Sequence, residues 1–187
     1  GMAFFATEND GKKQRVTELV AESTNVMCQA EPGKNHVKIN IANRKKYETE
    51  NAAREAFKSF VREHPELQNC HEAHALIIKQ GNSWYLTEIK VSQQETREVE
   101  EGKFESINYT EIIGYDNDVL SHMESGKDEK WDKMIRIHTH WGTGEHADEP
   151  SETDRRSAGK MRTFRLGDIS TDIPMKYEIY NATTQRW

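Results

Sequence analysis

An amphipathic helix followed at once by a hairpin is the feature that most constrains the fold of this chain of 187 residues. Small and apolar side chains recur every three or four positions between residues 49 and 62, which predicts a helix that ends before Pro65. Residues 73 to 79 and 83 to 91 are then two apolar runs joined by a Gly-Asn pair, a pattern typical of two strands and a tight turn. We therefore expect the helix to pack on a sheet that contains this hairpin.

Further periodic segments extend this arrangement on both sides. Their patterns predict, in chain order, an amphipathic helix at residues 12 to 23, a strand at 36 to 41, a strand at 134 to 137, a helix at 151 to 162, a strand at 175 to 180 and a turn at 181 to 184. From residue 49 onward the order is helix, strand pair, insertion, strand, helix and strand. This order favours an α/β fold in which helices flank a mixed β-sheet.

The length of the chain fits one domain with an added arm. We assign residues 1–48 to an N-terminal extension with a helix and a strand, and residues 49–187 to the domain itself. Charged residues are dense between about 92 and 130, so this part is interpreted as a mostly exposed insertion, with a strand or a short helix at 107 to 115.

Composition and charge exclude several classes of partner. The formal net charge is −6 and no dense Lys/Arg tract occurs, which disfavours nucleic acid, because that affinity depends on neutralising phosphates. No run of about 18 apolar residues occurs, so a membrane-spanning helix is not expected. The first residues lack the basic and apolar regions of a secretory signal, which predicts a cytoplasmic protein unless an export signal was removed before expression. The oligomeric state is left open.

Cys28 and Cys70 are the only cysteines of the chain, with 41 residues between them. This spacing excludes a CxxC metal knuckle or redox motif. Two reduced, partly buried thiols are the favoured interpretation, and one disulfide is the alternative.

A cluster of metal-binding residue types lies in the second half of the chain. The strand predicted at 134 to 137 runs into His138 and His140. Because successive strand side chains point to opposite faces, these two imidazoles are expected on the same side. After a gap of ten residues, Ser151 and Asp154 add a hydroxyl and a carboxylate. Two imidazoles and one carboxylate are a ligand set that suits an open catalytic zinc site.

These residues resemble the JAMM signature of the JAB/MPN metalloproteases, in which His, Ser or Thr, and His are followed after a short gap by Ser-x-x-Asp. The family also carries a catalytic Glu before an apolar strand, with a small residue shortly after it. Glu72 fits that position, and Ala75 stands where Gly is common. The resemblance covers about residues 50 to 187 and is nearest to bacterial JAB-like families. It implies a three-layer, cytidine-deaminase-like α/β architecture.

The resemblance also implies an activity, the zinc-dependent hydrolysis of a peptide or isopeptide bond in a peptide or protein substrate. His138, His140 and Asp154 are expected to hold Zn²⁺, which lowers the pKa of a bound water toward about 7. Glu72 is expected to act as the base and to return the proton to the leaving amine. Ser151 is expected to donate a hydrogen bond to the developing oxyanion.

Two departures from the family pattern concern the loop after the two histidines. The ten-residue gap before Ser151 is longer than the commonest form, and Trp141 stands where some members have Pro. The loop is therefore interpreted as reshaped around a substrate, with Trp141 as a wall of the groove. Glu88 is the reserve candidate for the base.

Structural interpretations compete with the functional ones. A His-x-His pair on a strand is often two hydrogen-bonded histidines, and Ser151 with Asp154 also suits the N-cap and first turn of a helix. Other polar residues near the motifs are interpreted as structural or solvated, namely His71, His74, His146 and Asp148. The alternative function is a non-catalytic JAB-like binding module, or a bacterial JAB-like toxin or repair-associated protein.

Overall fold

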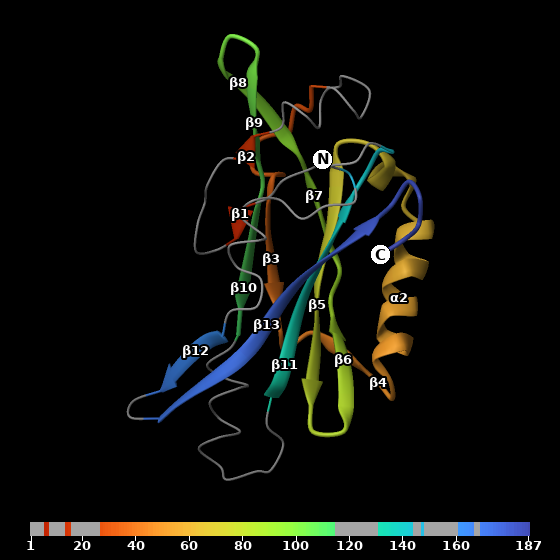
Figure 1. Cartoon of the computed structure of the whole chain (residues 1–187), viewed down its shortest axis with the longest axis vertical. Coiled ribbons are helices and arrows are strands. Elements are labelled where there is room, and N and C mark those ends of the chain that lie inside the picture. The colour runs from red at the N-terminus through yellow and green to blue at the C-terminus, as the bar shows by residue number, and fades with distance from the viewer. Residues whose placement is uncertain are drawn as a thin grey trace.

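Three layers make up the part of the chain described by the computed structural model (Figure 1). The described residues are 6–7, 14–15, 27–114, 131–143, 147, 161–166 and 169–187. Helix α2 (Glu50–Arg62) covers one face of a central seven-stranded sheet, and a three-stranded sheet covers the other face. The coarse prediction of a mixed α/β fold is therefore confirmed.

The central sheet is mixed, as predicted. Its strands run in the order β12 (Met161–Leu166), β13 (Ile169–Asn181), β11 (Trp131–His140), β5 (His71–Gln80), β6 (Ser83–Thr87) and β4 (Arg44–Tyr47), with β7 (Lys90–Gln93) beside the first half of β5. Strands β11 and β13 are parallel, whereas the other pairs are antiparallel. The β5–β6 turn is the predicted hairpin, and Gly81 supplies the positive φ that it needs.

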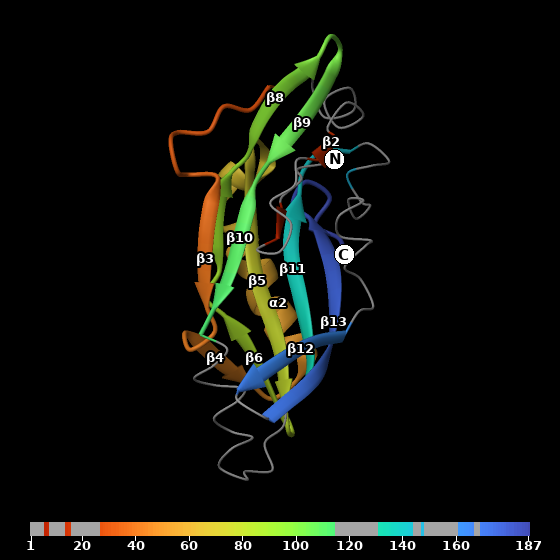
Figure 2. The same ribbon diagram turned by 90° about the vertical axis from the view of Figure 1, so that its left-hand side faces the viewer.

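Two smaller sheets accompany the central one (Figure 2). The first is parallel and has the order β1 (Ala6–Thr7), β10 (Tyr109–Ile113) and β3 (His36–Asn40). The second is antiparallel and has the order β2 (Gln14–Arg15), β9 (Lys103–Ile107) and β8 (Glu95–Glu100). The β1–β10–β3 sheet forms the third layer of the fold.

Helix α2 forms where the periodicity predicts it. The Thr49 hydroxyl caps its start by accepting from the Ala52 amide at 3.0 Å. Its apolar stripe of Ala53, Phe57 and Val61 is buried on the sheet. The helix ends before the short 3₁₀ helix η1 (Pro65–Gln68), because proline cannot continue the hydrogen-bond ladder. No helix among the described residues has the length and apolarity to cross a membrane.

Alternation along β5 divides the core into two halves. Ala73, Ala75 and Ile77 pack with α2, whereas Leu76 and Ile78 pack with the third layer. Strand β11 alternates in the same way, with Ile135 and Ile137 toward the helix and Met134 away from it. The even-numbered residues of β5, and those of β11 from Met134 onward, therefore face the β1–β10–β3 sheet.

Two predicted helices are wrong where the structure describes them. Gln14–Arg15, within the helix predicted at 12 to 23, form strand β2, which pairs with β9. Met161 and Arg162, at the end of the helix predicted at 151 to 162, begin strand β12 beside β13. Pairing with distant strands overrides the local periodicity at these positions. The rest of both predicted helices lies outside the described residues, and the second face of the sheet is covered by strands.

The region at 92 to 130 is only partly the exposed insertion that its charge indicates. The end of β8 and the turn to β9 are exposed, including Val99 at 45%. Strand β10, in contrast, buries Thr110 and Ile112 at the centre of the third layer. Residues of the predicted N-terminal extension join the same layers, since β3 pairs with β10 and β4 with β6.

The favoured interpretation of the cysteines as free thiols is wrong, because Cys28 and Cys70 form a disulfide. The bridge packs against Trp141, which is 2% exposed. Spacing alone could not reveal the pairing, because the two cysteines meet only when β5 and the segment before β3 have folded.

Replacing both cysteines by Ser is expected to lower the free energy of unfolding by about 2–4 kcal/mol. The bridge joins two residues with a sequence separation of 42 and so lowers the conformational entropy of the unfolded chain. Urea denaturation with and without a reducing agent measures the effect, and the Ser variant controls for the reagent. A wild-type midpoint that does not change on reduction would contradict the assignment.

Candidate functional site

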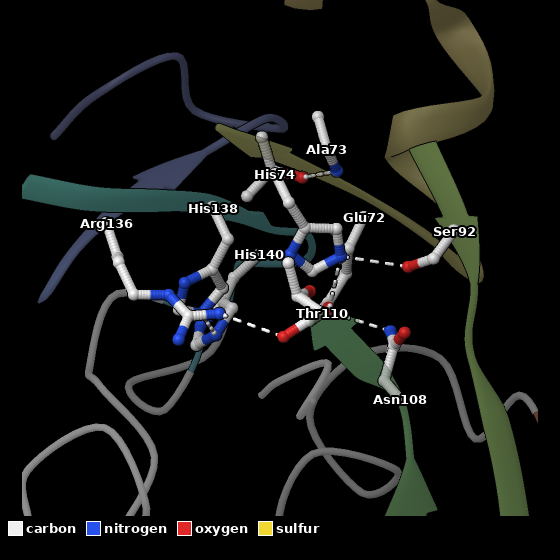
Figure 3. Close-up of polar contacts among 10 residues, drawn as sticks. Glu72, Ala73, His74, Ser92, Asn108, Thr110, Arg136, His138 and His140 are labelled. Carbon is white, nitrogen blue, oxygen red and sulfur yellow. Dashed lines mark hydrogen bonds and ion pairs between the residues drawn. The ribbon is translucent and has the colours of Figure 1, made fainter. Parts of the chain in front are cut away.

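Four polar side chains of two neighbouring strands gather between the central sheet and β10 (Figure 3). Glu72 and His74 come from β5, and His138 and His140 come from β11. Their exposed fractions are 0%, 1%, 0% and 0%. Burying polar groups costs free energy unless other groups replace their hydrogen bonds to water. We therefore expect the members of this cluster to have partners in the interior.

The strand register brings the cluster together. In the antiparallel β5–β11 pair, His138 lies directly opposite His74. Glu72 lies two residues before His74 and His140 two residues after His138, so in the antiparallel pair both lie at the same end and on the same face. Toward the other end, this face continues with Leu76 on β5 and, beyond Arg136, with Met134 on β11. The polar cluster therefore replaces the apolar core at one end of the two central strands.

The two histidines of the His-x-His motif point to one place, as predicted. Their Nε2 atoms are 3.1 Å apart, and their ring centroids are 5.0 Å apart. Two such nitrogens can share one proton in a hydrogen bond, or both can face one cation. Two imidazole nitrogens bound tetrahedrally to zinc are separated by roughly 3.3 Å, given Zn–N bonds of about 2.0–2.1 Å. The observed separation is close to this value.

Glu72 joins the histidines through His74. Its Oε2 accepts a hydrogen bond from Asn108 Nδ2 at 2.9 Å and lies 3.7 Å from His74 Nε2. His74 Nε2 is in turn 2.9 Å from Ser92 Oγ on β7. The ring of His74 stacks on that of His138 at a centroid distance of 6.0 Å. The carboxylate and the three imidazoles therefore form one series of side chains, each close to the next.

Arg136 places a buried positive charge beside this cluster. It precedes His138 by two residues on the same face of β11 and is 3% exposed. Its guanidinium donates to the Thr110 carbonyl at 3.3 Å and lies over the Tyr177 ring at 5.2 Å. The planar guanidinium suits both contacts, of which the bond to Thr110 connects the central sheet to β10 and the contact with Tyr177 joins β11 to β13.

Burial lowers the pKa of both His74 and His140 well below 6.5, because an imidazolium loses its hydration in the interior. The charge of His138 lowers both pKa values further, and Arg136 also lowers that of His74. Both imidazoles are therefore neutral near pH 7. Neutral imidazole is the form that binds a metal ion.

The described structure brings together three of the five site residues predicted from the sequence, namely Glu72, His138 and His140. Ser151 and Asp154 lie outside the described residues, as do His146 and Asp148. Within the described parts of the chain, no three His, Cys, Asp or Glu side chains converge closely enough to hold a metal ion. The third ligand therefore stays a prediction.

Glu88, the reserve candidate for the base, and Trp141 both make contacts that stabilise the fold. Glu88 accepts hydrogen bonds from the Asn40 amide at 3.1 Å and from Asn43 Nδ2 at 3.3 Å, so it secures the β3–β4 turn. Trp141 is buried against the disulfide, and its interpretation as a groove wall is wrong. His71 bonds to the Asn69 carbonyl through Nδ1 at 2.9 Å, which agrees with its structural interpretation.

Sequence reasoning missed Asn108 and Arg136, and it interpreted His74 as structural, which agrees with the contact between His74 and Ser92. One signal was present for His74, because a residue two positions after Glu72 on a strand shares its face. Asn108 is 36 residues from Glu72 in sequence, and no local pattern links them. Arg136 stands in an alternating strand where a buried cation is rare.

Comparison with known protein families, characterised proteins and solved structures finds no match for this chain. The functional argument therefore depends on the residues of the site and their contacts.

His74 and His140 are expected to make the metal-free protein less stable as the pH falls from about 7 to 5. Their pKa values are lower in the folded protein than in the unfolded chain, so in this range the unfolded chain binds more protons. Urea denaturation at a series of pH values measures the slope. A His74→Gln variant should give a shallower slope, whereas His36→Gln, at a side chain 45% exposed, should not. Equal slopes for all three proteins would contradict the assignment.

Proposed function

We propose that this protein is a zinc-dependent hydrolase of the JAB/MPN type that cleaves a peptide or isopeptide bond in a peptide or protein substrate. The observation that carries the proposal is the approach of His138 Nε2 to His140 Nε2 at 3.1 Å. The Glu72 carboxylate belongs to the same buried cluster. This combination supports a metal centre with a base beside it.

The chemistry of the donors fits zinc. The two imidazoles on one face of β11 are ligands that zinc accepts, and their nitrogens are already close to the spacing that a shared ion requires. Asp154 is the third ligand that the sequence motif supplies. The disulfide removes both cysteines from consideration as ligands.

Zinc, when bound, supplies an activated water near neutral pH. Glu72 accepts a proton and delivers it to the leaving amine, a task that suits a carboxylate within hydrogen-bond reach. Ser151 donates to the oxyanion that develops on the scissile carbonyl. The interior position of the cluster strengthens these interactions, because water screens them weakly there.

The architecture agrees with the expected family only in its coarse class. A central mixed sheet carries a helix on one face, but strands cover the other face, where the family resemblance implies helices. The acidic residue and the histidine pair lie on adjacent strands of that sheet, at the same end.

The disulfide favours an oxidising compartment over the cytoplasm.

A non-catalytic binding module is the second candidate. The complete burial of Glu72, His138 and His140 favours it, since a closed cluster can stabilise the fold without admitting a substrate. In a toxin-like or repair-associated form of this module, the net charge of −6 disfavours nucleic acid as the partner.

The purified protein is expected to hold one zinc ion per chain, and a double His138→Ala, His140→Ala variant is expected to lose it. Elemental analysis after dialysis against zinc at low concentration measures the metal. His36→Ala is the matched control, because this histidine is exposed on β3. Equal metal in the wild type and the double variant would exclude these ligands.

Glu72→Gln is expected to lower kcat by about 10²–10⁴-fold, because the amide keeps the shape of the side chain but cannot accept the proton. Cleavage of a mixed peptide library, followed by mass spectrometry, measures the rate. Glu88→Gln should cleave as fast as wild type, since Glu88 bonds to the β3–β4 turn. If Glu72→Gln also cleaves at the wild-type rate, Glu72 is not the base.

A further inference from the structure

Asn108 connects the third layer to the candidate base. It lies between β9 and β10, is 0% exposed, and donates from Nδ2 to Glu72 Oε2 at 2.9 Å. Figure 3 shows its carboxamide pointing to Glu72 from the β10 side. The contact spans 36 residues in sequence and joins two sheets.

This hydrogen bond distinguishes the two oxygens of the Glu72 carboxylate. An amide N–H can only donate, so the oxygen that it contacts must act as an acceptor. Oε2 is therefore committed to Asn108, and His74 Nε2 lies 3.7 Å from the same oxygen. A proton that Glu72 takes up is directed to its other oxygen, Oε1.

The neighbours of Glu72 keep this arrangement in place. The His74 nitrogen that lies beside Glu72, Nε2, is itself 2.9 Å from Ser92 Oγ, and this contact holds the ring next to the carboxylate. Asn108 itself is fixed at the point where β9 passes into β10, and β10 is paired with β3 over five residues. The carboxylate is thus oriented by strands on two sides of the cluster.

We propose that Asn108 is a positioning residue that orients the Glu72 carboxylate and selects the oxygen that accepts the proton. This inference rests on the proposed function, because it gives Asn108 a role in the same reaction. Asn108 acts through Glu72 and makes no contact with substrate in this role. Its loss lowers the rate of the chemical step and leaves substrate binding and zinc content in place.

The structure offers a matched control away from the histidines. Thr87 Oγ1 on β6 accepts a hydrogen bond from the Leu76 amide of β5 at 2.9 Å, and both residues are buried. Thr87→Val removes a buried hydrogen bond to the strand that carries Glu72 but leaves the carboxylate contacts unchanged. It therefore reports the effect of lost stability alone.

The experiment compares the zinc-loaded wild type with Asn108→Ala and Thr87→Val in cleavage of the mixed peptide library. Asn108→Ala is expected to lower kcat by roughly 10- to 100-fold with KM and zinc content unchanged. Thr87→Val is expected to keep kcat within about twofold of the wild type, because its carboxylate geometry is intact. Asn108→Asp, which keeps the size of the side chain, replaces the Ala variant if that one does not fold, and it should shift the pH profile upward because two carboxyls then share a proton.

Infrared spectroscopy of the zinc-free proteins provides a second readout that needs no turnover. The wild-type spectrum minus that of Glu72→Gln isolates the carboxylate band of Glu72. The same difference measured in the Asn108→Ala background is expected to show a shifted band, and in the Thr87→Val background an unshifted one. An active wild type whose kcat and Glu72 band are both unaffected by Asn108→Ala overturns this inference alone. A wild type that neither holds zinc nor cleaves the library overturns the proposed function and this inference with it.

Discussion

The antiparallel pairing of β5 with β11 is the constraint on which the rest of the structure depends. The pairing sets Ala75 opposite Ile137 and His74 opposite His138, so one register serves the core and the site together. Because side chains alternate along a strand, a slip of one residue would turn the histidines toward α2 and the isoleucines toward β10. The burial of Ile135 and Ile137 against the helix opposes such a slip.

A second consequence of this register is that the third layer must be polar where it meets the cluster. Buried carboxylates and guanidinium groups need partners, which are Asn108 between β9 and β10 and the Thr110 carbonyl on β10. Apolar contacts take over further along, where Ile112 meets the Leu76 side of the sheet. The interface between the layers therefore changes from polar to apolar along the length of β5.

Local patterns predicted the elements whose neighbours in space are also neighbours in sequence. Helix α2, the β5–β6 hairpin and the shared side of His138 and His140 depend on spacing alone, and all three are confirmed. The role of His74 needed the register of β5 against β11, and Asn108 needed the contact between two sheets. The disulfide likewise depends on tertiary structure. Sequence periodicity carries no information about such distant contacts, so these parts could not be predicted.

The parallel pairing of β11 with β13 has a consequence for synthesis of the chain. Strand β5 is complete long before β11 is made, but the other neighbour of β11 is the last strand of the described fold. On the ribosome, β11 therefore stands for a time as an open edge with unpaired backbone groups. During that interval, the edge from Met134 to His140 can pair with any other strand that reaches it.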